Sequence, residues 1–410
     1  KLSLIKKTYT KEEESTWKKK KMASSSSSSL FPSSFQITIL SFFLIIFSSA
    51  SASSSSPPPR PFNKIYAFGD SYTDTGNTRS LSGPSGFAHV SNPPYGMTFF
   101  HHPTNRYSDG RLVIDFVAEA LSLPYLPPYL HVGDSKTTDH GVNFAVGGST
   151  AIKHAFFVKN NLSLDMTPSS IQSQIGWFDK MLEGKGCKGS VSSSPRCKEV
   201  LDDALIWVGQ IGVNDYAYIL GSNITSDTIR KLAISSVTQS LKAILNRGVK
   251  YMVVQGFPLT GCLTLSMSLA AEDDRDELGC VKSVNDQSRA HNTIYQAKLV
   301  ELRKQFPEAT IVYLDQWNAY RAIVTDPKKY GFREVFKVCC GSGDPPYNFY
   351  VFAACGSPST KACSNPSQYI NWDGVHLTEG MYKVLSDMFL KGGFSDPPFS
   401  ELVSRKLRGG

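Results

Sequence analysis

The chain has 410 residues, 41% of them hydrophobic, which is enough apolar sequence to build a large buried core. Its formal net charge is +8, but residues 1–21 contain eight lysines and three glutamates and so hold +5 of that charge. The remainder is only mildly basic, so composition gives no reason to expect a nucleic-acid partner.

The N-terminal residues predict processing and linker sequence. Residues 1–21 are a low-complexity charged segment, typical of translated upstream sequence. The apolar run 37–47 is too short for a membrane span, which needs about 20 apolar residues, and is typical of the centre of a secretory signal. We therefore expect a signal peptide over 22–52, cleaved near Ala52, with an uncleaved anchor as the alternative. A flexible Ser/Pro-rich lead-in follows over 53–62.

The rest of the chain alternates between strand-like and helical patterns. Apolar runs at 64–68, 204–208, 251–255 and 311–314 predict strands, and 225–246 and 284–306 predict helices. Such alternation predicts the α/β class, as a three-layer α/β/α sandwich with a mostly parallel sheet. Because no linker or internal repeat interrupts it, we expect one domain over 63–400 and a short tail over 401–410.

The first motif follows the first strand. In IYAFGDSYTDTGN the apolar run breaks at Gly69, which predicts that Ser71 lies on a tight turn at the carboxyl end of a strand. Open α/β sheets bind their ligands at this edge. A serine hydroxyl becomes a nucleophile when a base takes its proton. Gly-Asp-Ser alone is a short match that chance also supplies, so the interpretation depends on the rest of the chain.

Two later segments contain donors suited to an oxyanion hole. GVNFAVGGSTA offers a glycine-rich turn with Gly148, and DALIWVGQIGVNDY offers Asn214 just after an apolar strand. Glycine lets a ligand approach a backbone N–H closely, and an asparagine amide donates without titrating. The alternatives are that Gly148 belongs only to a turn and that Asn214 is only a helix N-cap.

Cysteines and glycosylation sequons indicate an oxidising compartment. All eight cysteines follow the predicted signal, an even number that favours pairing. Bridges are expected between Cys187 and Cys197 and between Cys262 and Cys280, and two more within the cluster of positions 339, 340, 355 and 363. A zinc site is a weak alternative, because paired C-x-x-C spacings are missing. Asn161 and Asn223 begin sequons and are expected at the surface.

The last motif supplies the base. In YINWDGVHLTEGMYKVLSDMF a loop with Asp373 and His376 leads into an amphipathic helix. A carboxylate three residues before a histidine is able to bond its ring nitrogen, fix its tautomer and stabilise the imidazolium. The alternative is that Asp373 caps the helix and His376 is an ordinary loop residue.

With these four blocks in this order, residues 64–399 resemble the plant GDSL esterase/lipases of the SGNH hydrolase superfamily, whose fold is flavodoxin-like. The stretch 93–130 and the segments VQGFPLTGC and KVCCGSG are similar to that family as well. Two positions depart from it. Tyr72 stands where the family name has leucine, and Asn105 stands where many members have glycine. Neither position carries the chemistry, and Tyr72 is expected in the core.

The resemblance implies a role for each candidate residue. Ser71 is the nucleophile, His376 the base and Asp373 the residue that orients it. The backbone N–H groups of Ser71 and Gly148 and the amide of Asn214 form the oxyanion hole. No metal or organic cofactor is required, and the reaction is double displacement through an acyl-enzyme.

The expected protein is therefore a secreted, extracellular esterase or lipase, in the cell wall or apoplast by resemblance. Its substrate is a small-molecule, lipid or polysaccharide ester, and stable membrane insertion is not expected. An acyltransferase that uses the same acyl-enzyme is the alternative. The segment 263–281 has an apolar and an acidic half, and we expect a surface helix there, with a lid over the crevice as the alternative.

Overall fold

The computed structural model describes residues 60–82, 86–132, 138–162, 167–187 and 195–409. The segments predicted over 1–21 and 22–52 lie outside them, as does most of the predicted lead-in. The described residues belong to one compact unit.

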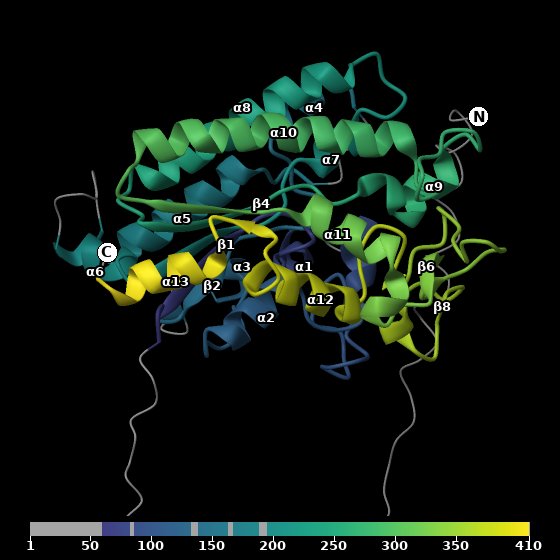
Figure 1. The fold of residues 1–410 in the computed structure, drawn as a ribbon, viewed down its shortest axis with the longest axis horizontal. Coiled ribbons are helices and arrows are strands. Elements are labelled where there is room, and N and C mark those ends of the chain that lie inside the picture. Colours follow the sequence, from purple (N-terminus) through teal and green to yellow (C-terminus); the bar gives the residue numbers. More distant parts are fainter. Residues whose placement is uncertain (1–59, 83–85, 133–137, 163–166, 188–194, 410) are drawn as a thin grey trace, which may run out of the picture. The chain divides into compact units, whose positions relative to one another are not determined.

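A six-stranded sheet organises the described residues (Figure 1), in the order β10-β5-β4-β3-β1-β2. Its strands are β1 (Lys64–Phe68), β2 (Gly141–Asn143), β3 (Ala204–Val208), β4 (Tyr251–Gln255), β5 (Thr310–Leu314) and β10 (Ser395–Asp396). The first five are parallel, and the short edge strand β10 is antiparallel to β5. The four strands predicted from apolar runs are confirmed, with β5 beginning one residue earlier than expected.

Both faces of the sheet are buried, because successive side chains of a strand point to opposite faces. In β1, Tyr66 and Phe68 belong to one core cluster, and Ile65 and Ala67 belong to another. All four side chains are fully buried. The apolar strands therefore require a helical layer on each side, as in other parallel sheets.

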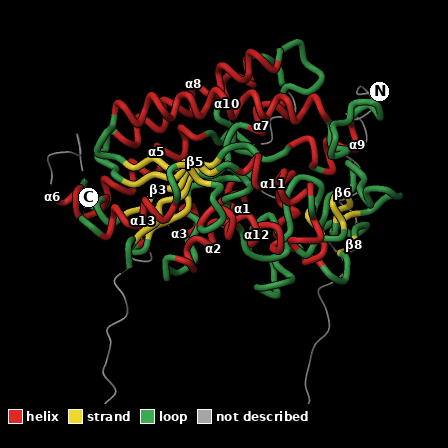
Figure 2. The backbone as a smooth tube through the Cα atoms, viewed as in Figure 1, coloured by secondary structure: helices red, strands yellow, loops and turns green. Residues whose placement is uncertain are grey.

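Two groups of helices supply these layers, and Figure 2 shows them on either side of the strands. The first cluster is covered by α5 (Ile171–Gly184), α7 (Val213–Tyr218), α8 (Ser226–Leu245) and α10 (Lys282–Gln305). The second is covered by α2 (Val113–Ala120), α11 (Gln316–Thr325), α12 (Glu379–Leu390) and α13 (Phe399–Leu407). The predicted three-layer α/β/α fold is confirmed.

Shorter elements fill the connections. The α-helices are α1 (Asn77–Ser82), α3 (Tyr129–Val132), α4 (His154–Lys159), α6 (Pro195–Leu201) and α9 (Thr264–Leu269). The 3₁₀ turns are η2 (Gly86–Ser91), η5 (Thr260–Cys262), η6 (Pro327–Tyr330) and η7 (Pro366–Gln368). Two small sheets pair β6 (Glu334–Val338) with β9 (Tyr369–Asn371) and β7 (Cys340–Gly341) with β8 (Lys361–Ala362).

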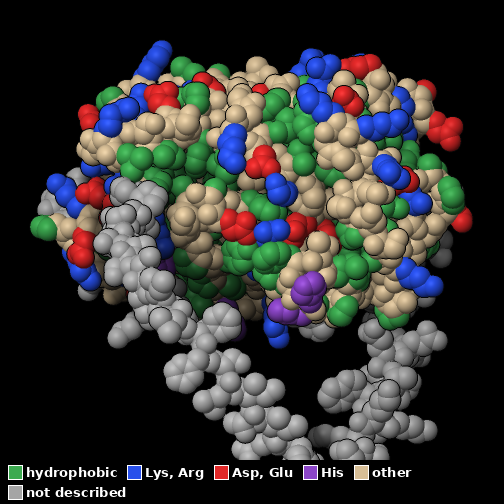
Figure 3. Space-filling model, turned by 60° about the horizontal axis from the view of Figure 1, so that its bottom comes forward, with side chains coloured by type: hydrophobic (Ala, Val, Ile, Leu, Met, Phe, Trp, Pro, Cys, Tyr) green, Lys and Arg blue, Asp and Glu red, His purple; other side chains and the backbone are tan. Residues whose placement is uncertain are grey.

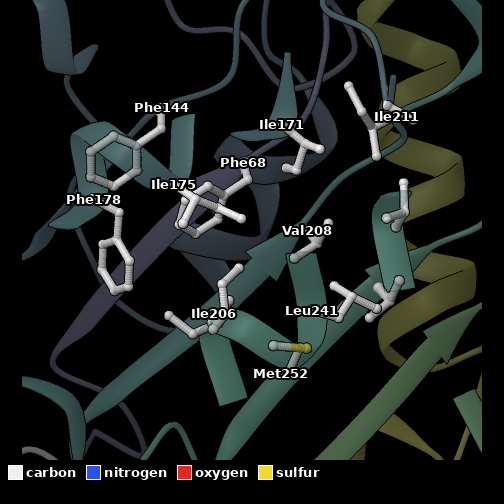
Figure 4. Packing of buried hydrophobic residues seen from close by; sticks show 14 of the residues in the cluster. Phe68, Phe144, Ile171, Ile175, Phe178, Ile206, Val208, Ile211, Leu241 and Met252 are labelled. Carbon is white, nitrogen blue, oxygen red and sulfur yellow. The ribbon is translucent and has the colours of Figure 1, made fainter. Parts of the chain in front are cut away.

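Aromatic rings dominate the first cluster near the end of β1 (Figure 4). Phe68 stacks on Phe144 with centroids 5.2 Å apart, and Phe178 from α5 meets both rings edge-on, at 5.4 and 5.7 Å. Offset and edge-to-face aromatic contacts add to the stabilisation that buried area gives. The end of β1 is therefore packed, on one face of the sheet, against both α5 and the segment after β2.

Four disulfides link the eight cysteines, and the two local bridges that the sequence predicts are confirmed. The cysteine cluster pairs as Cys339–Cys363 and Cys340–Cys355. Since every cysteine is bonded to another, the zinc alternative is wrong for these residues. Both bridges of the cluster hold the segment that precedes Asp373.

The surface in view in Figure 3 carries positive and negative side chains interspersed. Among the described residues, several charged side chains form short-range pairs along helices, such as Lys298 with Glu301 and Lys383 with Asp387, both at 2.8 Å. Such exposed pairs each stabilise the fold by at most about 1 kcal/mol. Within the described ranges, no helix is both long and apolar enough to cross a bilayer.

Candidate active site

Ser71 lies on a tight turn directly after β1, at the carboxyl edge of the sheet and between β2 and β3. We call residues 69–78 the Ser71 turn. Gly69 has φ +147°, a conformation that side-chain-bearing residues rarely adopt, and an added Cβ would lie 3.1 Å from Thr73. The Ser71 side chain is 4% exposed. The local sequence prediction for this turn thus matches the structure.

His376 and Asp373 lie on the loop between β9 and α12, which we call the Asp–His loop (residues 372–376). The His376 Nε2 is 2.7 Å from the Ser71 Oγ, across 305 positions of sequence. On the other side of the ring, Nδ1 is 2.8 Å from Asp373 Oδ2 and 3.0 Å from Oδ1. The structure therefore brings the three predicted side chains into one hydrogen-bonded chain.

The Asp373 carboxylate is held ionised. Burial by itself raises the pKa of this group, but the charge of His376 and hydrogen bonds from His376 and Tyr95 outweigh burial and lower it to about 2. The backbone N–H groups of Val375 and His376 also donate to Oδ1, over 3.0 and 2.8 Å. Helix α12 has a different cap, because the Thr378 hydroxyl accepts from the Met381 N–H. The alternative that Asp373 caps this helix is wrong.

Two tyrosine rings enclose His376. Tyr107 lies 4.6 Å from the imidazole centroid, and Tyr72 lies at 5.7 Å. Tyr72 is 5% exposed, as expected for a core residue, and meets Tyr382 of α12 edge-on. Its hydroxyl donates to the Val375 carbonyl over 2.7 Å. This departure from the family name therefore joins the Ser71 turn to the Asp–His loop.

Gly148 and Asn214 reach the same edge of the sheet. Gly148 lies on the turn after β2 with φ +79°. Within the described chain, neither its N–H nor that of Ser71 donates a hydrogen bond. The Asn214 amide donates to the Ser149 carbonyl over 2.9 Å and lies 3.5 Å from Asp70 Oδ2. Asn214 is inside α7, whose N-cap is Gly212, so the N-cap alternative is wrong.

A buried glutamine joins these two turns. The Gln174 side chain accepts from the Gly69 N–H over 3.0 Å and donates to the Gly69 carbonyl over 2.8 Å. Its amide also reaches the Ser149 hydroxyl at 3.2 Å. Gln174 comes from α5 and is fully buried. One side chain therefore fixes the spacing between the Ser71 turn and the turn that carries Gly148.

The Ser71 turn itself contains two buried carboxyl groups, those of Asp70 and Asp74. Asp74 accepts from the N–H groups of Gly76 and Asn77, both over 2.7 Å, and from the Gly147 N–H over 2.9 Å. Burial raises its pKa, while these hydrogen bonds and one from Thr78 lower it, and the net shift is upward. Burial likewise raises the pKa of Asp70 well above its usual range, against the lowering effect of a hydrogen bond from the Tyr72 N–H.

One residue in contact with Asp373, Tyr95, was missed by the sequence interpretation. The Tyr95 hydroxyl donates to Asp373 Oδ2 over 2.7 Å. Arg111, which is suited to brace a loop, pairs with Glu379 at 2.8 Å, and the Glu379 N–H donates to Asp109. These contacts tie the start of α12 to the stretch after Tyr95. The sequence signal for Tyr95 is its place in the family-like stretch 93–130, whereas Arg111 also flanks Asp109, which favours a loop-bracing ion pair.

The segment 263–281 differs from the single surface helix that we expected. It contains the short α9, whose Thr264 and Met267 are buried, followed by a loop closed by the Cys262–Cys280 bridge. Leu265 N–H donates to the Gly374 carbonyl over 2.9 Å. The apolar half therefore supports the Asp–His loop instead of forming one long amphipathic helix. Both sequon asparagines, at 161 and 223, are exposed.

The protein is a three-layer α/β/α sandwich. At the carboxyl edge of its sheet, a serine, a histidine and an aspartate form one hydrogen-bonded chain, which is typical of serine hydrolases. Comparison with known proteins narrows this class. The family GDSL-like Lipase/Acylhydrolase matches residues 65–389. The protein belongs to this family, in its plant GDSL esterase/lipase branch, and is a carboxylic ester hydrolase.

Relatives in Arabidopsis thaliana match nearly the whole chain. GDSL esterase/lipase At3g48460 is 63% identical over 353 residues, which cover 85% of this chain and 91% of the relative. GDSL esterase/lipase At2g27360 is 38% identical, with 83% and 87% covered. Among solved structures, an Axe2 acetyl xylan esterase variant from Geobacillus stearothermophilus has a TM-score of 0.36 at 12% identity, covering 81% of this chain and 95% of that one.

Proposed function

We propose that this esterase acts through an acyl-enzyme on Ser71. The observation that carries the proposal is the 2.7 Å contact between Ser71 Oγ and His376 Nε2. This distance lets His376 accept the hydroxyl proton as the oxygen attacks the ester carbonyl. Asp373 holds the ring through Nδ1 and stabilises the imidazolium that forms.

The oxyanion is assigned to the N–H groups of Ser71 and Gly148 and to the Asn214 amide. Two buried backbone donors without an acceptor in the described chain support this assignment, since buried N–H groups are otherwise nearly always paired. The Asn214 amide donates to Ser149 over 2.9 Å and reaches Asp70 Oδ2 only at the long distance of 3.5 Å, so the N–H of this weaker contact is the one assigned to the oxyanion. His376 then protonates the leaving alcohol, and water repeats the sequence on the acyl-enzyme.

Secretion, glycosylation and domain organisation are part of the proposal. Four disulfides favour an oxidising compartment. The exposed asparagines at 161 and 223 are accessible to a glycosyltransferase. We assign the signal to residues 22–52 and the hydrolase domain to residues 63–400.

The test is hydrolysis of p-nitrophenyl esters from acetate to palmitate by the secreted wild type and Ser71→Ala. We expect serine-dependent turnover with an optimum chain length, which would identify the acyl preference. Full activity in Ser71→Ala would contradict the mechanism. Adding an acceptor alcohol separates the two outcomes of the acyl-enzyme: a hydrolase releases free acid, whereas an acyltransferase diverts most of the acyl group to the alcohol.

A further inference from the structure

The Asp373 carboxylate receives a hydrogen bond from a residue 278 positions away, the hydroxyl of Tyr95, over 2.7 Å. Among the described residues, its other hydrogen-bond donors come from Val375 and His376, within its own loop. We propose that Tyr95 is a positioning residue for the Asp373–His376 pair. The inference rests on the proposed function, because it acts through the residues assigned there as base and orienting acid.

The geometry gives Tyr95 a specific task. Asp373 Oδ1 accepts the two loop N–H groups, and Oδ2 accepts the Tyr95 hydroxyl at 2.7 Å and His376 Nδ1 at 2.8 Å. Without the hydroxyl, the bond that Oδ2 must use to orient the imidazole would be the only one holding that oxygen. The two loop N–H groups on Oδ1 would then be the remaining restraint on rotation of the carboxylate about its Cβ–Cγ bond, and Oδ2 would be held less firmly against the ring nitrogen.

The chemistry also requires a donor that stays neutral. When His376 takes the Ser71 proton, the ring becomes positive and Asp373 must remain negative. A tyrosine hydroxyl stabilises that negative charge without adding a positive one near the imidazolium. Burial first, and then the adjacent Asp373, raise the pKa of Tyr95 well above its usual range, so it remains a donor at any working pH.

The Tyr95 ring is itself fixed in place. It is 5% exposed and meets Trp372 edge-on at 5.9 Å and Tyr107 at 6.5 Å. On either side of its Cα, the Tyr95 N–H donates to Asn92 and the Gly96 N–H donates to Ser108. A hydroxyl held this way is already aligned before substrate arrives, which is what a positioning contact requires.

The variant that tests the inference is Tyr95→Phe, with Tyr295→Phe as its matched control. Tyr295 is equally buried, lies on α10, and its hydroxyl has no partner within the described chain. We expect Tyr95→Phe to lower kcat on p-nitrophenyl butyrate about tenfold with KM within about twofold, as for loss of one charge-assisted hydrogen bond. The control is expected to keep the wild-type kcat.

A second readout separates positioning from general damage. The rate of Ser71 labelling by a fluorophosphonate is measured per folded molecule, with the folded fraction taken from near-UV circular dichroism. In the wild-type background, Tyr95→Phe is expected to slow labelling about tenfold. In an Asp373→Ala background it is expected to change the rate less than about twofold, because the group through which Tyr95 acts is gone.

Two other results would overturn the inference. Equal labelling rates for Tyr95→Phe and Tyr295→Phe, with the wild type labelled normally, would leave the triad intact and remove the role of Tyr95. The same tenfold loss in both the wild-type and the Asp373→Ala backgrounds would mean that Tyr95 acts independently of the carboxylate. Failure of the proposed function looks different, because the wild type itself would then not be labelled at Ser71.

Discussion

The two halves of the site are held in different ways. The Ser71 turn is fixed by the sheet and a helix packed on it: Gln174 of α5 bonds both backbone groups of Gly69, and the Asn143 amide of β2 donates to the Thr73 carbonyl over 2.6 Å. The Asp–His loop lies outside the central sheet and is fixed by side chains and segments that are far away in sequence. Examples are the Tyr72 hydroxyl on Val375, at a separation of 303 positions, and the Tyr95 hydroxyl on Asp373.

This difference follows from where each segment starts. The Ser71 turn begins at the end of a central strand, so the sheet and its helices determine its backbone. The Asp–His loop begins after β9, which pairs with β6 in a small two-stranded sheet separate from the central one. It depends on packing by Phe349 against Gly374, on the two disulfides before it and on the contacts of Tyr95. Substitutions in the supporting residues should therefore displace the base, His376, more readily than the nucleophile, Ser71.

The largest effect is expected from breaking the Asp373–His376 pair of the Asp–His loop. Asp373→Asn keeps the size of the side chain but replaces the charged acceptor of His376 with an amide. We expect kcat/KM on p-nitrophenyl butyrate to fall by about 10³–10⁴, the order seen when the orienting carboxylate of a triad is lost. A second variant, His376→Ala, should lose a similar amount, and the double variant little more, because the residues act as a unit. Fully additive losses would argue against a shared mechanism.

The next prediction compares two disulfides. Replacing Cys340 and Cys355 by serine opens a link across 15 positions, which should cost about 3 kcal/mol of unfolding free energy in the chain-entropy model. Because the Cys340 N–H donates to the Trp372 carbonyl over 2.7 Å, the same variant should also lower kcat. The measurements are urea unfolding and esterase kinetics of the folded protein.

The control for that experiment is the bridge between Cys187 and Cys197 of α6, which spans 10 positions and belongs to a different core cluster from the cysteines near the Asp–His loop. Its removal should reduce stability by a similar or slightly smaller amount and leave kcat unchanged. If the two double serine variants lowered kcat equally, the effect on activity would not come from the support that the Cys340–Cys355 bridge gives to the Asp–His loop.

The third prediction concerns how the stability of the protein depends on pH through Asp373. The pKa of Asp373 is lowered to about 2 in the folded protein, from an ordinary value near 3.8. A lowered carboxyl pKa stabilises the fold above the unfolded value, and this contribution is lost as pH falls through the folded value. From pH 5 to pH 2, wild type should therefore lose about 2 kcal/mol more than Asp373→Asn does. The measurement is the free energy of urea unfolding as a function of pH for both proteins. Parallel curves for wild type and Asp373→Asn would show that ionisation of Asp373 does not stabilise the fold.

Much of the fold and the residues of the candidate site were predictable from the sequence. Strands such as 204–208 are uninterrupted apolar runs, and the turn at Gly69 requires glycine, so local pattern is enough to locate Ser71. The Asp373–His376 bond is local as well, since three positions separate the residues. Their catalytic roles, like those of Gly148 and Asn214, stay predictions until variants are measured.

What the sequence could not supply are contacts between distant segments. Four clustered cysteines allow three pairings, and only the folded chain selects Cys339–Cys363 and Cys340–Cys355. Tyr95 is an ordinary loop residue in the linear sequence, and Arg111 is recognisable only as suited to a loop-bracing ion pair. Both meet their partners, Asp373 and Glu379, when the stretch 93–130 packs on the Asp–His loop and the start of α12. Their roles depend on packing, which no local periodicity encodes.

The smallest predicted effect concerns the contact that joins the two halves directly. Tyr72→Phe removes the hydroxyl that donates to the Val375 carbonyl and leaves the ring in its place between His376 and Tyr382. One hydrogen bond contributes about 1 kcal/mol, so the melting temperature should fall by a few degrees. Because the Ser71 turn is held independently by the sheet and α5, removal of this hydrogen bond should loosen the Asp–His loop. The lower kcat would then come from a less well-placed His376.

Tyr72→Leu sharpens this last comparison, since leucine is the residue of the family name at that position. It removes the ring as well as the hydroxyl and should destabilise the protein more than Tyr72→Phe does. If the Asp–His loop needs only apolar packing from this side, the leucine variant will keep the kcat of the phenylalanine variant despite its lower melting temperature. A further drop in kcat would show instead that the aromatic ring itself holds His376 against Ser71.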